Sequence, residues 1–180
     1  MKKIFIRIAV VLLGTLAVFL AYVATLPDDW RIARSASIKA PPEKIYPLIA
    51  DLRAMNQWNP FAKQDPTAKM VYGGLTRGKG ASYTWDSTGQ AGKGRMEIVD
   101  TVAPSNVSMM LHMEKPMEAH NNVVFTLQPK GEATEVTWTM TGRHNFLTKA
   151  MGAVFDIDRM VGGEFAKGLL DLKQLTETAS

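Results

Sequence analysis

The chain has 180 residues, a formal net charge of +4 and no cysteine, which excludes disulfides, cysteine nucleophiles and cysteine-ligated metals. Its positive charge comes largely from Lys2, Lys3 and Arg7, because the remaining residues hold 18 of the 21 basic side chains against all 17 acidic ones. This near balance argues against nucleic-acid binding, which requires a concentrated basic face.

An apolar segment near the N-terminus, residues 8–26, contains 19 residues and no charged side chain. As a helix rising about 1.5 Å per residue it would span about 28 Å, close to the hydrocarbon thickness of a bilayer. Basic residues precede the segment, and Asp28 and Asp29 follow it. The positive-inside rule therefore predicts a single-pass signal-anchor, residues 1–27, in a bacterial-type inner membrane, with residues 28–180 as a domain on the outer, periplasmic side.

A cleaved signal peptide is the alternative interpretation of this segment. Such a peptide has a shorter apolar run, followed by small residues at the first and third positions before the cleavage point. Cleavage after Ala24 would place Tyr22 at that third position, and cleavage after Ala21 would place Phe19 there. A buried core helix would show a polar stripe, which this segment does not offer. The sequence therefore favours a retained anchor.

The middle of the chain is predicted to hold one strand, two short helices and six further strands. Apolar and polar residues alternate in the strands, and apolar residues recur at helical spacing in the helices. Pro42 suits the first turn of the first helix, and Pro60 is expected to stop the second. Glycine and proline turns separate the last six strands, which must pair mostly as antiparallel hairpins. In chain order, the predicted elements are residues 31–39, 43–52, 55–58, 69–72, 81–87, 95–102, 107–114, 122–128 and 134–142.

The last segment, residues 146–178, has no proline and is predicted to form one long amphipathic helix. Its expected weak point is Gly162-Gly163, because each glycine inside a helix costs about 1 kcal/mol relative to alanine. The pair indicates either a kink or a close approach of the helix to the sheet. A seven-stranded antiparallel sheet must bury this helix across one face. We therefore predict an α+β fold in which the sheet curls around the C-terminal helix and leaves a cavity between them.

The predicted inner face of the sheet is rich in methionine and aromatic residues. The alternation in the strands places these side chains on one side, and methionine suits surfaces that accept varied apolar ligands. A solid core is the competing interpretation for each single residue. The candidate cavity-lining, ligand-binding residues are Tyr83, Trp85, Met96, Met109, Leu111, Phe125, Trp138, Met140, Phe155 and Met160.

The sequence offers no catalytic constellation. Residues 73–79 match the start of a phosphate-binding loop, but Gly80 stands where Ser or Thr is required, and a strand follows instead of a helix. His112, His120 and His144 show no helical metal-ligand spacing and no serine triad. We therefore predict no catalytic residue, no metal and no cofactor.

Five short stretches stand out in the sequence: APPEKIY at residues 40–46, WNPF at 58–61, GRMEI at 94–98, VFTL at 124–127 and VTW at 136–138. Together with the glycine-broken final helix, they resemble the START-like (SRPBCC) superfamily, in its polyketide cyclase/dehydrase and lipid-transport branch. The resemblance covers about residues 30–178 and implies the helix-grip arrangement with a deep apolar cavity. It implies no universal catalytic motif.

These observations predict a membrane-anchored module that binds or transports a hydrophobic small molecule or lipid. Two alternatives stay open. One is a cyclase- or dehydratase-like enzyme acting on a hydrophobic substrate, which would need a polar acid–base group inside the cavity. The other is an interaction or assembly module with a filled core. The sequence names neither the ligand nor a protein partner.

We predict that residues 8–26 are retained in the mature protein, because their apolar run is long and no suitable cleavage point follows it. N-terminal sequencing of the protein purified from membranes should begin at the start of the chain. A mature N-terminus between Thr25 and Trp30 would contradict the anchor.

Overall fold

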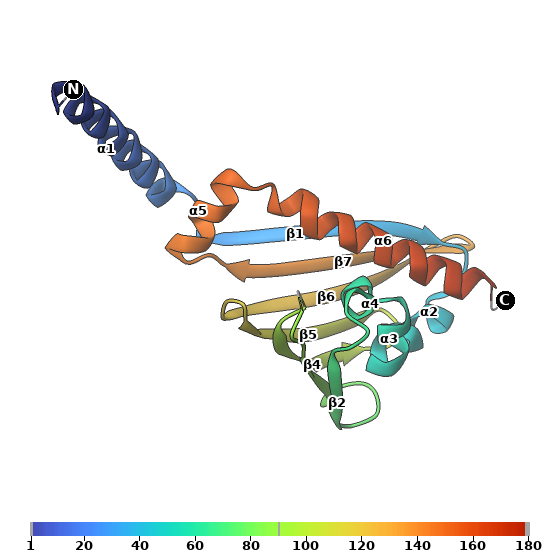
Figure 1. The fold of residues 1–180 in the computed structure, drawn as a ribbon. Coiled ribbons are helices and arrows are strands. Elements are labelled where there is room, and N and C mark those ends of the chain that lie inside the picture. The colour runs from blue at the N-terminus through green and yellow to red at the C-terminus, as the bar shows by residue number, and fades with distance from the viewer. Residues whose placement is uncertain (1, 90, 179–180) are drawn as a thin grey trace. The chain divides into compact units, whose positions relative to one another are not determined.

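The computed structural model describes residues 2–89 and 91–178, which form six helices and seven strands (Figure 1). Each predicted strand is present, and most are a few residues longer than the sequence pattern indicated. In chain order the elements are α1 (Lys2–Thr25), β1 (Asp29–Ile38), α2 (Pro42–Ala50), α3 (Leu52–Trp58), α4 (Pro60–Gln64), β2 (Lys69–Gly74), β3 (Ala81–Asp86), β4 (Lys93–Val102), β5 (Asn106–Lys115), β6 (Ala119–Lys130), β7 (Ala133–Arg143), α5 (Phe146–Val154) and α6 (Ile157–Thr178).

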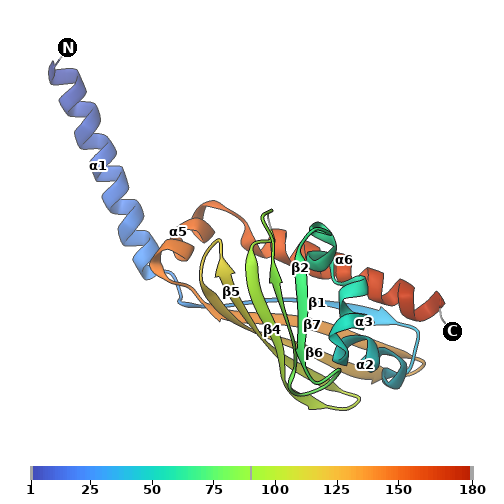
Figure 2. The same cartoon turned by 60° about the horizontal axis from the view of Figure 1, so that its bottom comes forward.

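The seven strands form one sheet in the order β1-β7-β6-β5-β4-β3-β2. From β2 to β7 every strand pairs with the next one along the chain as an antiparallel neighbour. The sheet is strongly twisted, so that β2 to β4 run at a steep angle to β1 and β7 (Figure 2). The predicted α+β class with a seven-stranded antiparallel sheet and a long C-terminal helix is confirmed.

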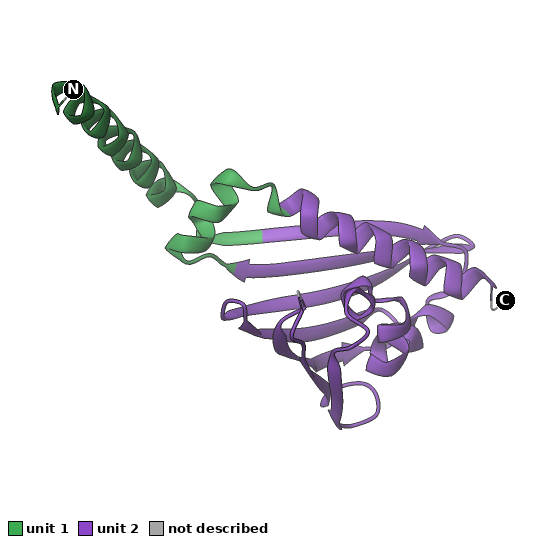
Figure 3. Ribbon diagram, in the orientation of Figure 1, with its two compact units in different colours: residues 1–30, 143–157 green, residues 31–142, 158–180 purple. Residues whose placement is uncertain are grey.

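The chain divides into two compact units (Figure 3). The first consists of residues 1–30 and 143–157, and the second of residues 31–142 and 158–180. Residues 143–157 therefore group with the N-terminal segment, although they lie far from it in sequence. The domain boundary predicted after residue 27 stays a prediction.

The first unit holds α1 and α5. Asp28 connects its two segments: its carboxylate forms an ion pair with Lys149, and its carbonyl oxygen accepts a hydrogen bond from the His144 backbone N–H at 2.7 Å. The Trp30 and His144 rings stack with centroids 5.8 Å apart. Hydrogen bonding and charge attraction from Lys149 lower the pKa of the Asp28 carboxyl, so this contact is an ion pair at neutral pH.

Within the second unit, α3 and α4 begin at side-chain caps. The Asp51 carboxylate accepts hydrogen bonds from the backbone N–H groups of Arg53 and Ala54. Asn59 ends α3 and caps α4, where its side chain accepts from the Phe61 N–H and Pro60 occupies the first turn. The sequence correctly predicted a stop at residues 59–60 but missed α4, because the same proline that ends one helix can begin the next.

The C-terminal segment departs from the prediction of a single helix weakened at its glycines. The interruption lies at Phe155 and Asp156, and α6 runs through Gly162 and Gly163 without a break. A side chain at Gly162 would overlap the guanidinium of Arg34, whose Nη2 lies 2.8 Å from Oδ2 of Asp158. This glycine therefore admits Arg34 of β1 against the helix, which is a close approach of helix to sheet and not a kink.

The core of the second unit contains a cluster of aromatic rings centred on Trp138 of β7. Its ring stacks on Phe165 of α6 with centroids 4.2 Å apart and meets the edges of Trp58 and Phe61 at 5.8 and 6.2 Å. Only 3% of the Trp138 surface is exposed. This residue therefore connects α6, the α3–α4 segment and the sheet.

We predict that Trp138→Ala lowers the free energy of unfolding by about 3–5 kcal/mol, the usual cost of truncating a buried large aromatic side chain. Urea denaturation of the full chain in detergent, followed by circular dichroism, measures this change. Thr139→Ala, at the next position on the same strand, is the control and should lose far less, because its side chain is smaller and accepts one exposed hydrogen bond, from Arg31. A loss below about 1 kcal/mol for Trp138→Ala would contradict the central packing role.

Candidate ligand cavity

A cavity of about 360 Å³ lies in the second unit, bounded by the inner face of the sheet, by α4 and by the start of α6. This volume falls within the range of small-molecule binding sites, which extends from about 300 to 1,000 Å³. The residues that line the cavity are Asn59, Phe61, Ala62, Gln64, Asp65, Ala68, Met70, Tyr83, Trp85, Ala91, Met96, Leu111, Met113, Asn121, Val123, Trp138, Met140, Val161 and Phe165.

The structure brings six of the ten candidate lining residues together around this cavity. They come from four strands whose alternating side chains share the inner face. These residues are Tyr83, Trp85, Met96, Leu111, Trp138 and Met140. Met109 and Phe125 share that face but are buried in the packed core beside the cavity, where Phe125 contacts Trp138 with ring centroids 4.9 Å apart.

The two candidates from the C-terminal segment, Phe155 and Met160, do not line the cavity and are largely exposed. On α6 the lining residues are Val161 and Phe165, which lie four positions apart and so share one helix face. Met160 precedes Val161 by one residue, which turns its side chain by about 100° around the helix. The i, i+4 spacing of Val161 and Phe165 was the sequence signal that could have found them.

One wall of the cavity is aromatic and closely packed. Tyr83 lies 5.7 Å from Trp85 and 5.7 Å from Tyr72, measured between ring centroids. Trp85 pairs with Gly94 across β3 and β4, and a Cβ atom at Gly94 would lie 2.6 Å from the indole ring. The indole therefore lies directly over the glycine, and its N–H donates to the Ala91 carbonyl at 2.9 Å. The ring face remains apolar.

The polar side chains of the lining already have partners within the protein or lack acid–base character. Asp65 accepts hydrogen bonds from the Ser87 hydroxyl and from the hydroxyl and backbone N–H of Thr67. These bonds, that from Ser87 first, lower the pKa of its carboxyl, so it stays ionised and is a poor proton donor at neutral pH. Burial raises the pKa of the Tyr83 phenol further above neutrality.

No histidine is among the lining residues of the described chain. The lining thus presents mainly thioether, aromatic and aliphatic surface. Its neutral polar groups include the amides of Asn59, Gln64 and Asn121, the phenol of Tyr83 and the indole N–H of Trp138. This arrangement can hold an apolar molecule and orient one polar end. It does not present a group poised to transfer a proton near neutral pH.

A twisted antiparallel sheet that holds a long C-terminal helix over an apolar cavity defines a helix-grip protein of the START-like type. The model of the family described as polyketide cyclase / dehydrase and lipid transport matches residues 29–177. The chain belongs to this family. The resemblance seen in the sequence is therefore confirmed.

Solved structures similar to this chain share its fold. The Aha1 dimer from Colwellia psychrerythraea is 19% identical, with a TM-score of 0.58 over 82% of this chain and 96% of that one. Protein MLL2253 from Mesorhizobium loti is 15% identical (TM-score 0.60; 84% and 99% covered), and TTHA0849 from Thermus thermophilus is 16% identical (TM-score 0.58; 84% and 99% covered). The comparison with curated proteins gives no match.

Proposed function

We propose that the protein is a membrane-anchored module that binds or transports a hydrophobic small molecule or lipid in the cavity between the sheet and α6. The observation that carries this proposal is the 360 Å³ cavity with its predominantly apolar lining. Membership of a family described by both enzymatic and lipid-transport functions is consistent with it. The ligand class follows from the lining, because apolar walls favour ligands that water excludes.

Methionine gives the cavity its adaptability. Met70, Met96, Met113 and Met140 all line it, and they come from four different strands. The unbranched thioether side chain changes rotamer easily and fills irregular space. A lining of this kind suits a class of related apolar molecules better than one rigid substrate.

The tether is α1. It is the one helix in the described residues that is long and apolar enough to cross a membrane, judged by length and composition. Its 24 residues correspond to a helix of about 36 Å. Under the positive-inside rule, Lys2 and Lys3 favour a cytoplasmic N-terminus and a cavity on the outer, periplasmic side. An apolar cargo has little solubility in water, so a module held at the bilayer meets its ligand where that ligand is concentrated.

Helix α5 supports the same arrangement. It belongs to the same compact unit as α1, and the ion pair between Lys149 and Asp28 fixes it to the end of the anchor. Its exposed apolar side chains make an unpaired apolar surface beside a membrane-spanning segment. Such a surface is stabilised when it enters the headgroup region. These side chains are Phe146, Leu147, Met151 and Val154, and the exposed Phe155 follows directly after the helix.

The two alternatives receive less support. A cyclase- or dehydratase-like enzyme would need an acid–base group in the cavity, and the carboxylate that lines it, Asp65, is held ionised by three hydrogen bonds. An interaction module with a filled core would leave no internal space of this size. Hydrophobic-ligand binding is therefore the function that the geometry supports best.

We predict that Met140→Trp abolishes the binding of a fluorescent long-chain fatty acid, while the protein stays folded. The larger side chain would fill the cavity and leave no room for the ligand. In a core without a cavity, the same substitution would lower the free energy of unfolding by about 1–3 kcal/mol. Fluorescence titration of the full chain in detergent, in the presence of EDTA and without nucleotide, measures binding. A thermal melt of the same samples measures stability.

The matched control is Met110→Trp, which introduces the same side chain at an exposed position on the opposite face of the sheet. This variant should bind the fatty acid as the wild type does. Unchanged binding by Met140→Trp would contradict the ligand cavity. A large fall in the melting temperature of this variant would contradict it too, because it would show that the tryptophan has no space to enter.

We predict that α5 lies in the membrane interface. Because the chain has no cysteine, Leu147→Cys can be labelled uniquely with an environment-sensitive fluorophore and the full chain placed in phospholipid vesicles. Its emission should shift to the blue and resist quenching by iodide, since the label would leave water. Glu132→Cys, in the exposed turn between β6 and β7, is the control and should stay accessible to iodide. Equal quenching at both positions would contradict the prediction.

A further inference from the structure

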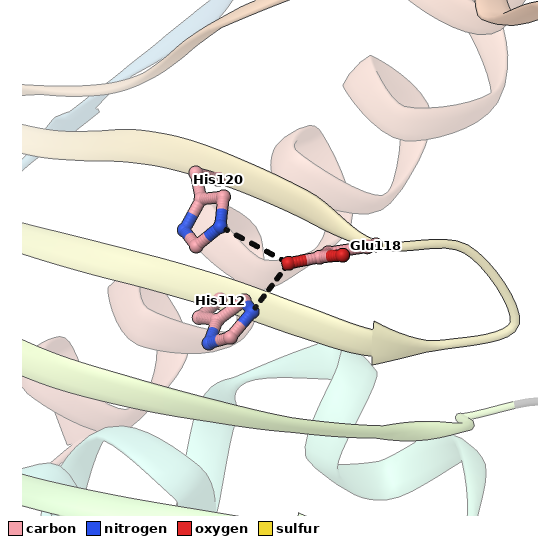
Figure 4. A group of neighbouring side chains, drawn as sticks. All are labelled: His112, Glu118 and His120. Atoms are coloured by element: carbon pink, nitrogen blue, oxygen red, sulfur yellow. Dashed lines mark ion pairs between the residues drawn. The ribbon is translucent and has the colours of Figure 1, made fainter.

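Two histidines and a glutamate meet on the face of the sheet opposite the cavity (Figure 4). His112 of β5 and His120 of β6 are direct cross-strand partners, and Glu118 stands two residues before His120 at the turn. Leu111, Met113 and Asn121 of the same strands line the cavity, so alternation directs the histidines to the outer face. The two imidazole rings stack with centroids 4.2 Å apart and planes inclined by 17°.

The three side chains converge on one point. The Nε2 atoms of His112 and His120 lie 3.8 and 3.6 Å from Oε1 of Glu118, and the three ligand atoms all lie within 4.8 Å of one another. These separations are too long for hydrogen bonds. They approach the spacing of about 3.4 Å between neighbouring ligands in a tetrahedral site whose metal–ligand bonds are about 2.1 Å.

The electrostatics of the cluster favour a bound cation. The Glu118 carboxylate supplies an anionic ligand to the cluster, and Nε2 of His112 is buried without a hydrogen-bond partner among the described residues. Arg95 is the partner of His112 on the neighbouring strand, but its guanidinium pairs with Glu97 at 2.8 Å. Lys93 likewise pairs with Glu114 at 2.9 Å, so neither basic side chain is directed to Glu118.

We propose that His112, Glu118 and His120 form a binding site for a divalent transition-metal ion of the Zn²⁺ type. Imidazole nitrogen and carboxylate oxygen are ligands that Zn²⁺ accepts, and three protein ligands leave the fourth tetrahedral position to water. The ion links the end of β5 to the start of β6. It therefore cross-links the two strands of a hairpin whose opposite face forms part of the cavity wall.

The test is isothermal titration calorimetry of ZnCl₂ into the full chain in detergent, with any affinity tag removed and the protein first treated with EDTA. One Zn²⁺ should bind per chain. Glu118→Gln should weaken binding at least about tenfold, because even residues outside the ligand set change metal affinity by that factor. Its side chain is 75% exposed, so this variant keeps the fold.

Two controls separate the cluster from other parts of the surface. Glu114→Gln removes a neighbouring carboxylate that does not belong to the cluster, and His144→Ala removes the third histidine of the chain. Both should bind Zn²⁺ as the wild type does. At one Zn²⁺ concentration, Zn²⁺ should also raise the melting temperature of the wild type and of these controls by more than that of Glu118→Gln or His120→Ala.

Absence of saturable Zn²⁺ binding by the wild type would overturn the proposal. Undiminished binding by Glu118→Gln or His120→Ala would overturn it as well, and so would an equal loss in His144→Ala. The fatty-acid titration in EDTA is independent of these results, so the metal site and the ligand cavity can fail separately.

Discussion

The packing of α6 against the inner face of β7 is the constraint on which the rest of the second unit depends. The Phe165 ring lies almost parallel to the Trp138 ring, with an angle of 6° between their planes. Gly168, one turn further along the helix, allows this approach, because a Cβ atom there would lie 3.0 Å from the Trp138 ring and 2.8 Å from Pro60. Helix, sheet and the α3–α4 segment meet at this point, and the remaining separation between them is the cavity.

Close packing at one end and open space at the other follow from the same set of side chains. Trp58, Phe125 and Trp138 fill the region beneath α3 with edge-to-face and tilted contacts. Beyond them the lining adds four methionines and Leu111 to the aromatic wall of Tyr83 and Trp85, and a volume that a ligand can enter remains between them. A rigid aromatic cluster beside an adaptable methionine surface supports both a stable fold and tolerance of varied apolar cargo.

The hairpin of β5 and β6 illustrates how one piece of sheet can serve two sites. Its inward residues contribute to the cavity, whereas His112 and His120 stand on the opposite face with Glu118. Because neighbouring residues of a strand point to opposite sides of the sheet, the apolar lining residues and the two histidines lie on different faces. A metal ion bound on the outer face would cross-link β5 and β6, and so stabilise this part of the cavity wall, without entering the cavity.

The sequence by itself determined the features that depend on local pattern. The uncharged run near the N-terminus, the seven strands and the inner-face positions of Tyr83, Met96 and Trp138 all follow from composition and periodicity, which neighbouring residues decide. The sequence pattern did not predict α4, because a proline such as Pro60 can end one helix and can equally occupy the first turn of the next.

Only the tertiary structure decided the features that depend on contacts between distant residues. The sequence indicated either a kink or a close approach at Gly162, and the structure shows the close approach, to Arg34, which is far away along the chain. Met160 and Val161 are both apolar, and the docking of α6 alone selects Val161 for the cavity. His112 and His120 become neighbours through the register of the β5–β6 hairpin, which is fixed by the conformation and length of its turn, and the sequence pattern located that turn without setting either.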